Sequence, residues 1–309
     1  MALSGAMTTL LITHPDCRNH VTPPGHPEQV ARLTYIEAAL APIEGLDRRE
    51  APLCRDEDIL RCHPRAYLDA IAGAGAGQLD ADTWMSAGSY AAARRAVGGA
   101  VAAVDAVMAG EVRNAFVAAR PPGHHAETAK PMGFCLFGNV SIAAKHALDG
   151  HGLSRVAVID FDVHHGNGTQ DLLWDEARAL FCTSQQMPLW PGTGEASETG
   201  AHDNVLNVPL RPGTGGIEMR DAYERLVFPR VDAFAPEMIL ISAGFDAHAE
   251  DPLANLNWET DDFAWLTDKI CGLAEKHCEG RIVSVLEGGY DLDALAASAK
   301  AHVLGLMAG

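Results

Sequence analysis

The chain has 309 residues, of which 48% are hydrophobic and 21% charged, and its formal net charge is −18 at pH 7. This content supports a large core, and the acidic balance argues against nucleic-acid binding. An acidic surface could attract cationic ligands or could serve solubility alone. Seven cysteines without any Cys-x-x-Cys pair favour reduced thiols over a disulfide framework.

Residues 1–12 lack the basic start and the apolar core of a signal peptide, and no run approaches the ~20 apolar residues of a membrane span. We therefore expect a cytoplasmic protein with no membrane partner. No linker, low-complexity tract or internal repeat is present, so residues 1–309 are expected to form a single domain. The Gly/Ala stretch at 71–77 is predicted as a loop after a helix.

Strands and helices are predicted to alternate along the chain. Apolar and β-branched runs predict strands at 8–13, 114–119, 156–163, 179–184, 204–209, 238–243 and 282–287. Apolar positions at helical spacing predict helices at 28–41, 89–109, 138–148, 217–234, 260–278 and 292–306. This alternation is typical of βαβ units, so we predict an α/β fold with a mostly parallel, multi-stranded sheet flanked by helices.

Two adjacent histidines, His124 and His125, follow the strand predicted at 114–119, in the segment Arg-Pro-Pro-Gly-His-His-Ala-Glu. Imidazoles have a reference pKa of about 6.5, so they suit general base and general acid catalysis near neutral pH. Alone, such a pair is commonly part of a solvated loop. Its meaning therefore depends on the motifs around it.

Asp162 and His164 come at the end of the strand predicted at 156–163, and Asp246 follows the strand predicted at 238–243. Side chains two residues apart on a strand share a face, so the first two can converge on one ion. Asp246 is the natural third ligand. Two carboxylates and one imidazole leave a coordination position open, as in a catalytic zinc site that activates water.

Tyr290 follows the last predicted strand, in the segment Glu-Gly-Gly-Tyr that begins at Glu287. Its phenol stands on a flexible diglycine turn and could donate a hydrogen bond to an oxyanion. The alternative is a core tyrosine that packs after a strand.

In this order, the motifs resemble those of the zinc-dependent histone deacetylase family, which also contains acetylpolyamine amidohydrolases and related bacterial amidohydrolases. The resemblance runs from about His14 to the C-terminus. It rests on residues 24–28, 120–125, 133–135, 160–170, 191–194, 242–246 and 287–290. It implies one catalytic domain with the arginase/deacetylase type of α/β fold.

The resemblance implies that Asp162, His164 and Asp246 bind one zinc ion. It also implies that His125 acts as general base toward the attacking water and then as general acid toward the departing amine. His124 would be its electrostatic or proton-sharing partner.

Three further roles follow from the resemblance alone. Tyr290 would hydrogen-bond the oxyanion, and Asp160 would orient His124. Asp160 and Ser184 would also help to hold a structural potassium ion, which would touch two of the zinc ligands as well.

The subtype is predicted to be class II-like, because Asn167 stands where class I members carry an aspartate. Phe134 and Trp190 correspond to the aromatic walls of the family's substrate tunnel, and Leu253 corresponds to the aliphatic residue that closes it. The polyamine-selective class II member has a glutamate at the position of Leu253.

Gly133 and Asp82 complete the predicted substrate-binding set. Gly133 lies beside the aromatic wall in the family pattern, and Asp82 aligns with the rim aspartate that holds the backbone of a peptide substrate.

The leading hypothesis is a cytoplasmic zinc amidohydrolase that removes acetyl, or another short acyl group, from an ε-amino-type nitrogen. Its substrate would be an acetyl-lysine peptide or protein, or an acetylated polyamine. Hydroxamate inhibitors are expected to bind, and an oligomer is compatible with the sequence.

Three alternatives remain. The first is a catalytically silent, zinc-containing module that binds an acyl ligand or a protein. The second is an arginase-type site with two manganese ions, which needs further Asp and His ligands that these motifs do not provide. The third is adventitious hydrolysis of a small amide, which would show poor selectivity.

Overall fold

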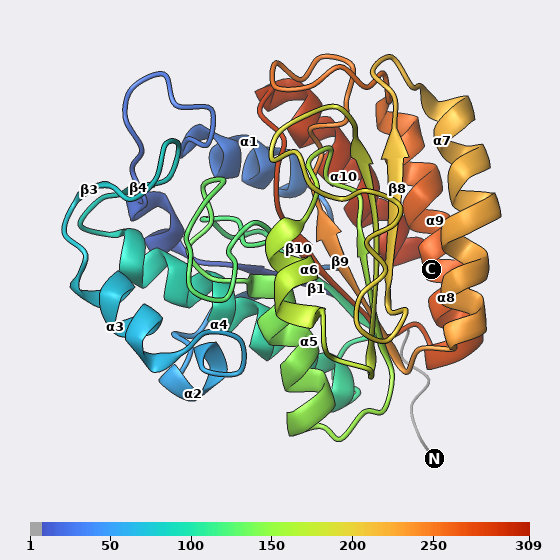
Figure 1. The fold of residues 1–309 in the computed structure, drawn as a ribbon, viewed down its shortest axis with the longest axis horizontal. Helices are drawn as coiled ribbons and strands as arrows, with labels where there is room; N and C mark the ends of the chain where they lie inside the picture. Colours follow the sequence, from blue (N-terminus) through green and yellow to red (C-terminus); the bar gives the residue numbers. More distant parts are fainter. Residues whose placement is uncertain (1–7) are drawn as a thin grey trace.

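A parallel eight-stranded sheet forms the centre of the structure, a computed structural model that describes residues 8–309 (Figure 1). Its strands are β1 (Thr9–Thr13), β2 (Asp47–Glu50), β5 (Asn114–Val117), β6 (Val156–Asp160), β7 (Ala179–Gln186), β8 (Val205–Leu210), β9 (Met238–Ala243) and β10 (Ile282–Leu286). Their order across the sheet is β2-β1-β5-β10-β9-β6-β7-β8, with every neighbouring pair parallel. The carboxyl ends of all eight strands therefore meet at one edge.

Helices cover the sheet on both faces, as apolar strands buried on both sides require. On one face, α4 (Ser89–Met108) and α5 (Asn139–Gly150) pack against the strands. On the other face lie α9 (Thr260–Cys278) and α10 (Leu292–Ala308), with α1 (Ala31–Leu40) against α10.

The shorter helices and strands extend this arrangement at its periphery. They are η1 (Pro15–Asn19), α2 (Asp56–Ile59), α3 (Arg65–Gly73), α6 (Asn167–Leu173), α7 (Gly216–Ala222), the π-helical turn η2 (Tyr223–Val227), α8 (Phe228–Phe234), and the antiparallel pair β3 (Gly77–Gln78) and β4 (Trp84–Met85). Within residues 8–309, no helix combines the length and apolarity that a membrane crossing needs. Of the N-terminal segment considered for targeting, residues 1–7 lie outside the described part of the chain.

The predicted α/β class and the mostly parallel sheet are confirmed, and the extent of a single domain over 1–309 stays a prediction. Several of the predicted strand and helix boundaries were wrong. β6 ends at Asp160, not at 163, because the Asp160 carboxylate accepts the N–H of Asp162 at 3.0 Å and turns the chain. The helix predicted at 217–234 is interrupted by η2, and α3 includes the start of the predicted 71–77 loop.

Sequence patterns missed β2 and the short helices α2 and α6, whereas α3 is the helix expected before the 71–77 stretch. β2 has the sequence Asp-Arg-Arg-Glu and is mostly exposed at the edge of the sheet, so it shows no apolar alternation. Charged residues on an edge strand also discourage pairing with another chain.

A buried carboxylate joins the segment before α1 to the loop after β5. Glu28 is fully buried and accepts hydrogen bonds from Arg120 Nη2 at 2.6 Å and from Arg32 Nη1 at 3.2 Å. Burial opposes its ionisation, but the Arg120 charge and a hydrogen bond from His20 hold its pKa well below the ordinary value. Arg32 also donates to the carbonyls of Glu287 at 2.5 Å and Gly289 at 2.7 Å.

Replacing Glu28 with glutamine should reduce the free energy of unfolding by about 3–5 kcal/mol, because two buried guanidinium groups lose their counter-charge. Urea denaturation monitored by circular dichroism measures this. The matched control is Glu111→Gln, which removes an exposed ion pair with Arg49 (2.6 Å) and should cost no more than about 1 kcal/mol. Equal losses in the two variants would contradict the assignment.

Stability should depend on pH partly through His302, which is buried on α10 between the hydroxyls of Thr267 (2.7 Å) and Ser284 (2.8 Å). Burial lowers its pKa to about 3, whereas an unfolded histidine titrates near ~6.5. Between these values only the unfolded chain binds the proton, so stability falls as pH falls through this range. His302→Gln should therefore reduce the loss of unfolding free energy between pH 7 and pH 5 by about 2 kcal/mol. Denaturant titrations at both pH values test this, with the exposed His202→Gln as control. An unchanged pH dependence in His302→Gln would refute it.

Candidate active site

Asp162, His164 and Asp246 lie together beyond the carboxyl ends of β6 and β9. The Nδ1 atom of His164 is 3.2 Å from Asp162 Oδ1 and 3.0 Å from Asp246 Oδ2. One ligand atom from each residue lies within 4.8 Å of the others. The structure thus brings the three predicted ligands together, although through the loop after β6 and not through a shared strand face.

The buried carboxylates of Asp162 and Asp246 need a positive charge beside them to offset the cost of burial. Both carboxylates are fully buried. Burial opposes charge on His164, but its hydrogen bonds to Asp162 and Asp246 raise its pKa to about 10. A proton between two buried carboxylates takes the electrostatic place that a metal cation would take.

The geometry around the group also fits a metal ion. A Cβ atom at Gly288 would lie 2.2 Å from Asp246 Oδ2 and 2.5 Å from Asp162 Oδ2, so glycine keeps these oxygens accessible. Two carboxylates and one imidazole are a donor set that zinc accepts.

The pKa values of His124 and His125 are shifted in opposite directions. His124 Nδ1 is 3.0 Å from Asp160 Oδ2. Burial disfavours its charge, but the charges of Asp162 and Asp160 raise its pKa well above the ordinary value. For His125, burial and then the positive charges of His124 and His164 hold the pKa well below the ordinary value. His125 is therefore neutral beside a cationic His124.

The proton of neutral His125 is placed by Asn167. The Asn167 amide donates to Glu127 Oε1 at 2.8 Å, which directs its carbonyl oxygen to His125 Nδ1 at 2.7 Å. A carbonyl oxygen only accepts, so Nδ1 carries the proton and Nε2 keeps a free lone pair. The position of Asn167 fits the prediction of a supporting amide. Sequence reasoning gave no role to Glu127, although it belongs to the same motif as His125.

Glu287 holds the loop that carries the two histidines. Its Oε2 accepts the N–H groups of Gly123 at 2.7 Å and His124 at 3.1 Å. Glu287 is fully buried at the end of β10, and burial raises its pKa to about 7. Sequence reasoning quoted this glutamate in a motif but did not identify its function.

Tyr290 faces the same space from the turn after β10. Its ring lies 5.7 Å from Phe134 and 5.0 Å from the Arg32 guanidinium, measured to ring centroids. Burial raises the pKa of its phenol well above the ordinary value, so the hydroxyl keeps its proton. The backbone N–H of Tyr290 donates to Asp251 Oδ2 at 2.7 Å.

Asp251 is a positioning residue that the sequence analysis missed. Besides the Tyr290 N–H, it accepts the N–H of Leu253 at 3.0 Å, so it connects the turn of the phenol to a wall of the cavity. Burial and the nearby Asp246 charge raise its pKa to about 7. No local motif marks its link to the Tyr290 turn, because that backbone N–H is 39 residues away in sequence.

A cavity of about 220 Å³ opens onto the metal-ligand group. All five predicted substrate-binding residues line it, together with one that was not predicted, Leu189. The lining residues are Asp82, His125, Gly133, Phe134, His164, Leu189, Trp190, Leu253 and Tyr290.

The walls of this cavity contact His125 directly. Trp190 packs edge-on against His125, with ring centroids 4.7 Å apart. Gly133 has φ +56° and approaches so closely that a Cβ there would lie 2.4 Å from His125 Cδ2. Asp82 Oδ1 accepts the Gly133 N–H at 3.1 Å, so its carboxylate supports the wall as well as the rim.

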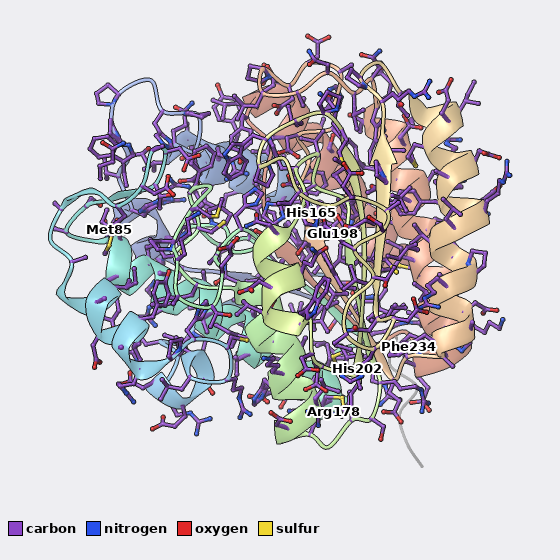
Figure 2. All side chains as sticks on the ribbon, in the orientation of Figure 1. Met85, His165, Arg178, Glu198, His202 and Phe234 are labelled. Atoms are coloured by element: carbon purple, nitrogen blue, oxygen red, sulfur yellow. The ribbon has the colours of Figure 1, made fainter. Side chains whose placement is uncertain are left out.

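Residues that follow β6 and β7 fasten the loop that carries Trp190. His165 contacts Thr193 Oγ1 at 2.7 Å and Gln170 Oε1 at 3.0 Å, and the Gln170 amide donates to Glu198 at 2.5 Å. His165 and Glu198 lie close together beside α6 (Figure 2). These contacts hold the loop on the C-terminal side of Trp190, at Thr193 and Glu198.

Ser184 and Asp160, the two residues predicted to hold potassium, make hydrogen bonds within the protein. Ser184 Oγ is 2.7 Å from the hydroxyl of Tyr223, while Asp160 contacts His124 and the Asp162 N–H. A potassium ion stays a prediction of the resemblance.

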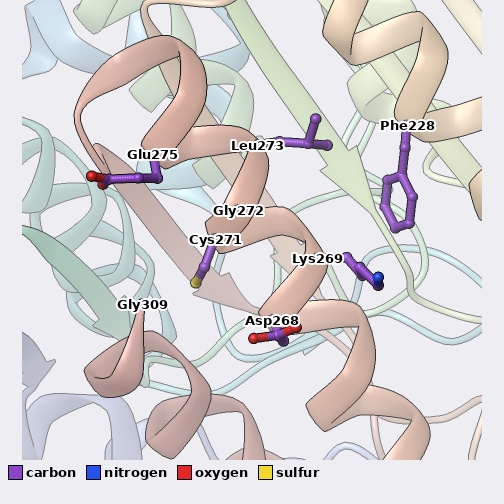
Figure 3. Close-up of a pocket in the computed structure, with 8 residues that line it drawn as sticks. All are labelled: Phe228, Asp268, Lys269, Cys271, Gly272, Leu273, Glu275 and Gly309. Carbon is purple, nitrogen blue, oxygen red and sulfur yellow. The ribbon is translucent and has the colours of Figure 1, made fainter.

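A larger hollow of about 540 Å³ lies elsewhere, between α9, Phe228 of α8 and the chain end at Gly309 (Figure 3). Figure 3 shows Cys271 directed toward the last turn of α10, and none of the predicted site residues is present. Size alone therefore does not locate the chemistry of this molecule.

Comparison with known proteins agrees with the geometry. A family model of the histone deacetylase domain matches residues 26–306. The histone deacetylase-like amidohydrolase of Pseudomonas aeruginosa is 42% identical over 283 residues, which cover 87% of this chain and 74% of that protein. A probable deacetylase of Archaeoglobus fulgidus is 36% identical over 314 residues, which cover 98% of this chain and 87% of that protein.

A solved structure, that of the HDA15 HD domain, has a TM-score of 0.93 and 31% sequence identity, and the match covers 98% of this chain and 88% of that one. The fold and the sequence thus lead to the same conclusion as the ordered motifs. The chain belongs to the histone deacetylase family.

Proposed function

We propose that the protein is a zinc-dependent amidohydrolase that removes acetyl, or another short acyl group, from ε-amino-type nitrogens of acetyl-lysine peptides or acetylated polyamines. One observation carries the proposal: the same cavity is lined by His164 of the candidate metal group, by His125, whose pKa is lowered, and by Tyr290, whose pKa is raised. Membership of the histone deacetylase family and the deacetylase and amidohydrolase names of relatives support it.

Asp162, His164 and Asp246 would hold the zinc ion. Bound there, zinc would polarise the amide carbonyl and lower the pKa of water to about 7. Zinc binding would also displace the proton of His164, because a ligating imidazole is neutral at the coordinating nitrogen.

His125 would take the proton of the attacking water on Nε2, because Asn167 keeps the other proton on Nδ1. The same nitrogen would then return a proton to the departing amine. His124 would keep its own charge, stabilised by Asp160, and would favour the developing oxyanion electrostatically.

Tyr290 would donate its hydroxyl proton as a hydrogen bond to the oxygen of the former carbonyl. Its high pKa keeps that donor available across the neutral range. Asp251 and Arg32 hold the turn from two sides, so the phenol is positioned before the substrate arrives.

Phe134 and Trp190 would contact the methylene chain of the acylated amine, as aromatic walls suit a linear apolar stem. Asp82 at the rim would accept hydrogen bonds from a peptide backbone. Leu253 supplies no carboxylate for the distant cation of a polyamine, and together with Asp82 it favours an acyl-lysine peptide over a polyamine. Asn167 supports a class II-like subtype.

A cytoplasmic location and a structural potassium ion are further parts of the proposal. The described chain contains seven free, buried cysteines, which supports a reducing compartment. The proposal of a potassium ion rests on the resemblance alone, in which Asp160 and Ser184 match positions that hold the ion in the family.

Turnover of the zinc-loaded protein on a matched panel tests the proposal. The panel contains an acetyl-lysine peptide, a trifluoroacetyl-lysine peptide, acetylspermidine and acetylputrescine, each with and without a hydroxamate inhibitor. Hydroxamate-sensitive turnover that is highest on a lysine peptide is expected. No turnover despite stoichiometric zinc would instead favour a binding module, and similar turnover of all amides would indicate adventitious hydrolysis.

Tyr290→Phe should lower kcat on the best substrate by about 100-fold or more, because one oxyanion donor is lost while packing is kept. Bound zinc, measured by elemental analysis, should be unchanged. The control is Tyr67→Phe, which removes another buried phenol, bonded to the Leu136 carbonyl at 2.7 Å, outside the cavity. Wild-type turnover in Tyr290→Phe would remove the phenol from the mechanism.

Asp246→Ala should abolish zinc binding itself, since it removes one of three ligands from a buried site. Equilibrium dialysis against a zinc buffer compares this variant with wild type and with Tyr290→Phe. Retention of zinc by Asp246→Ala at the wild-type affinity would show that the ligand set is different.

A further inference from the structure

A second group of side chains that could hold a metal ion lies where α4 and α5 pack together. The two helices are labelled in Figure 1. Asp105 belongs to α4, His146 belongs to α5, and His151 directly follows α5. The Nε2 atoms of the two histidines approach the same oxygen, Asp105 Oδ1, at 2.6 and 2.7 Å. Within residues 8–309, only this group and the one at Asp162 bring three such ligand atoms within 4.8 Å of one another.

The cluster is separate from the catalytic cavity. It occupies the C-terminal end of α5, whereas the first residue of that helix, Asn139, donates to the Pro121 carbonyl in the catalytic loop at 3.2 Å. A helix of 12 residues is about 18 Å long, so the two sites lie at opposite ends of α5.

The two histidines meet because α5 ends between them. On a continuous helix, side chains five residues apart point about 140° away from each other. Here the helix ends at Gly150, and His151 leaves it with φ −105° and ψ −4°. The two rings consequently meet edge to face, with centroids 5.2 Å apart and planes at 89°.

Burial differs across the cluster in a way that suits an ion at the surface. The His146 side chain is only 8% exposed, and its Nδ1 is buried without a hydrogen-bond partner, so Nε2 makes the only polar contact of this ring. Asp105 is 53% exposed and His151 is 26% exposed, so water can reach the remaining coordination positions. The buried His146 and the more exposed Asp105 and His151 thus direct their ligand atoms toward one position.

We propose that Asp105, His146 and His151 form a second metal site, for a divalent transition ion of the zinc, nickel or copper class. Imidazole ligands select these ions over magnesium or calcium. Ligand atoms at about 2.0–2.1 Å around a tetrahedral ion lie about 3.3 Å apart. The two nitrogen–oxygen distances must therefore widen by roughly 0.6 Å, which the exposed Asp105 and His151 side chains can provide.

An ion at this position would connect the end of α5 to α4. Binding to the folded state alone raises the unfolding temperature, with no requirement for a change in turnover. The site would thus stabilise the scaffold behind the catalytic loop and would not take part in catalysis.

Isothermal titration of tag-free protein with Zn²⁺, with elemental analysis after dialysis, tests the proposal. Wild type is expected to bind two equivalents, and Asp246→Ala is expected to keep one. If wild type binds one equivalent and His151→Ala loses it, the zinc site at Asp162 is contradicted and the site at Asp105 is supported. A wild type whose single equivalent is lost in Asp246→Ala would overturn this proposal.

Two variants separate a metal site from a simple hydrogen-bonded clamp. His151→Ala removes an exposed ligand, and Asp105→Asn keeps a carbonyl acceptor but removes the charge. Both should weaken binding of the second equivalent at least tenfold. In the Asp246→Ala background, where only the second site remains, both should abolish the rise in unfolding temperature with Zn²⁺. The control is His202→Ala, which removes an exposed histidine paired with Asp175 at 2.8 Å but has no third ligand. Persistence of the second equivalent in both cluster variants would refute the site.

Discussion

The burial of four carboxylates at one edge of a parallel sheet is the constraint on which the rest of this structure depends. Asp160, Asp162, Asp246 and Glu287 are all fully buried near the ends of β6, β9 and β10. An uncompensated buried anion costs several kcal/mol or more. The surrounding chain is arranged to compensate each of them with N–H groups, imidazoles and a place for a cation.

The compensation also builds the site. Glu287 accepts two N–H groups from the loop of the catalytic histidines, and Asp162 accepts the N–H of Gly288 at 2.8 Å from the turn that carries Tyr290. Asp246 accepts the N–H of Val163 at 2.9 Å from the loop after β6. The same carboxylates therefore fix the backbone of three loops around the proposed metal site. Loss of one carboxylate would disturb both that site and the geometry of its neighbours.

The sequence predicted the central strands, and it singled out the three residues that the structure brings together as candidate ligands, because both depend on local pattern. β6, β9 and β10 are apolar throughout, and the chemical residues follow within a few positions of their ends. Other features depend on contacts between distant segments. The edge strand β2 is polar, and Asp251 and Glu127 act through partners that no local spacing specifies. The π-helical turn η2 likewise interrupts a regular apolar periodicity.

The position of β10 in the sheet affects how the chain folds during synthesis. This last strand lies in the middle of the sheet, between β5 and β9, and not at an edge. β2, β1 and β5 form one block and β9, β6, β7 and β8 form another, and only β10 connects them by hydrogen bonds. During synthesis, the sheet cannot close until residues 282–286 have left the ribosome. Such non-local pairing slows folding, so a truncated product would hold two unjoined half-sheets with open edges and a tendency to aggregate.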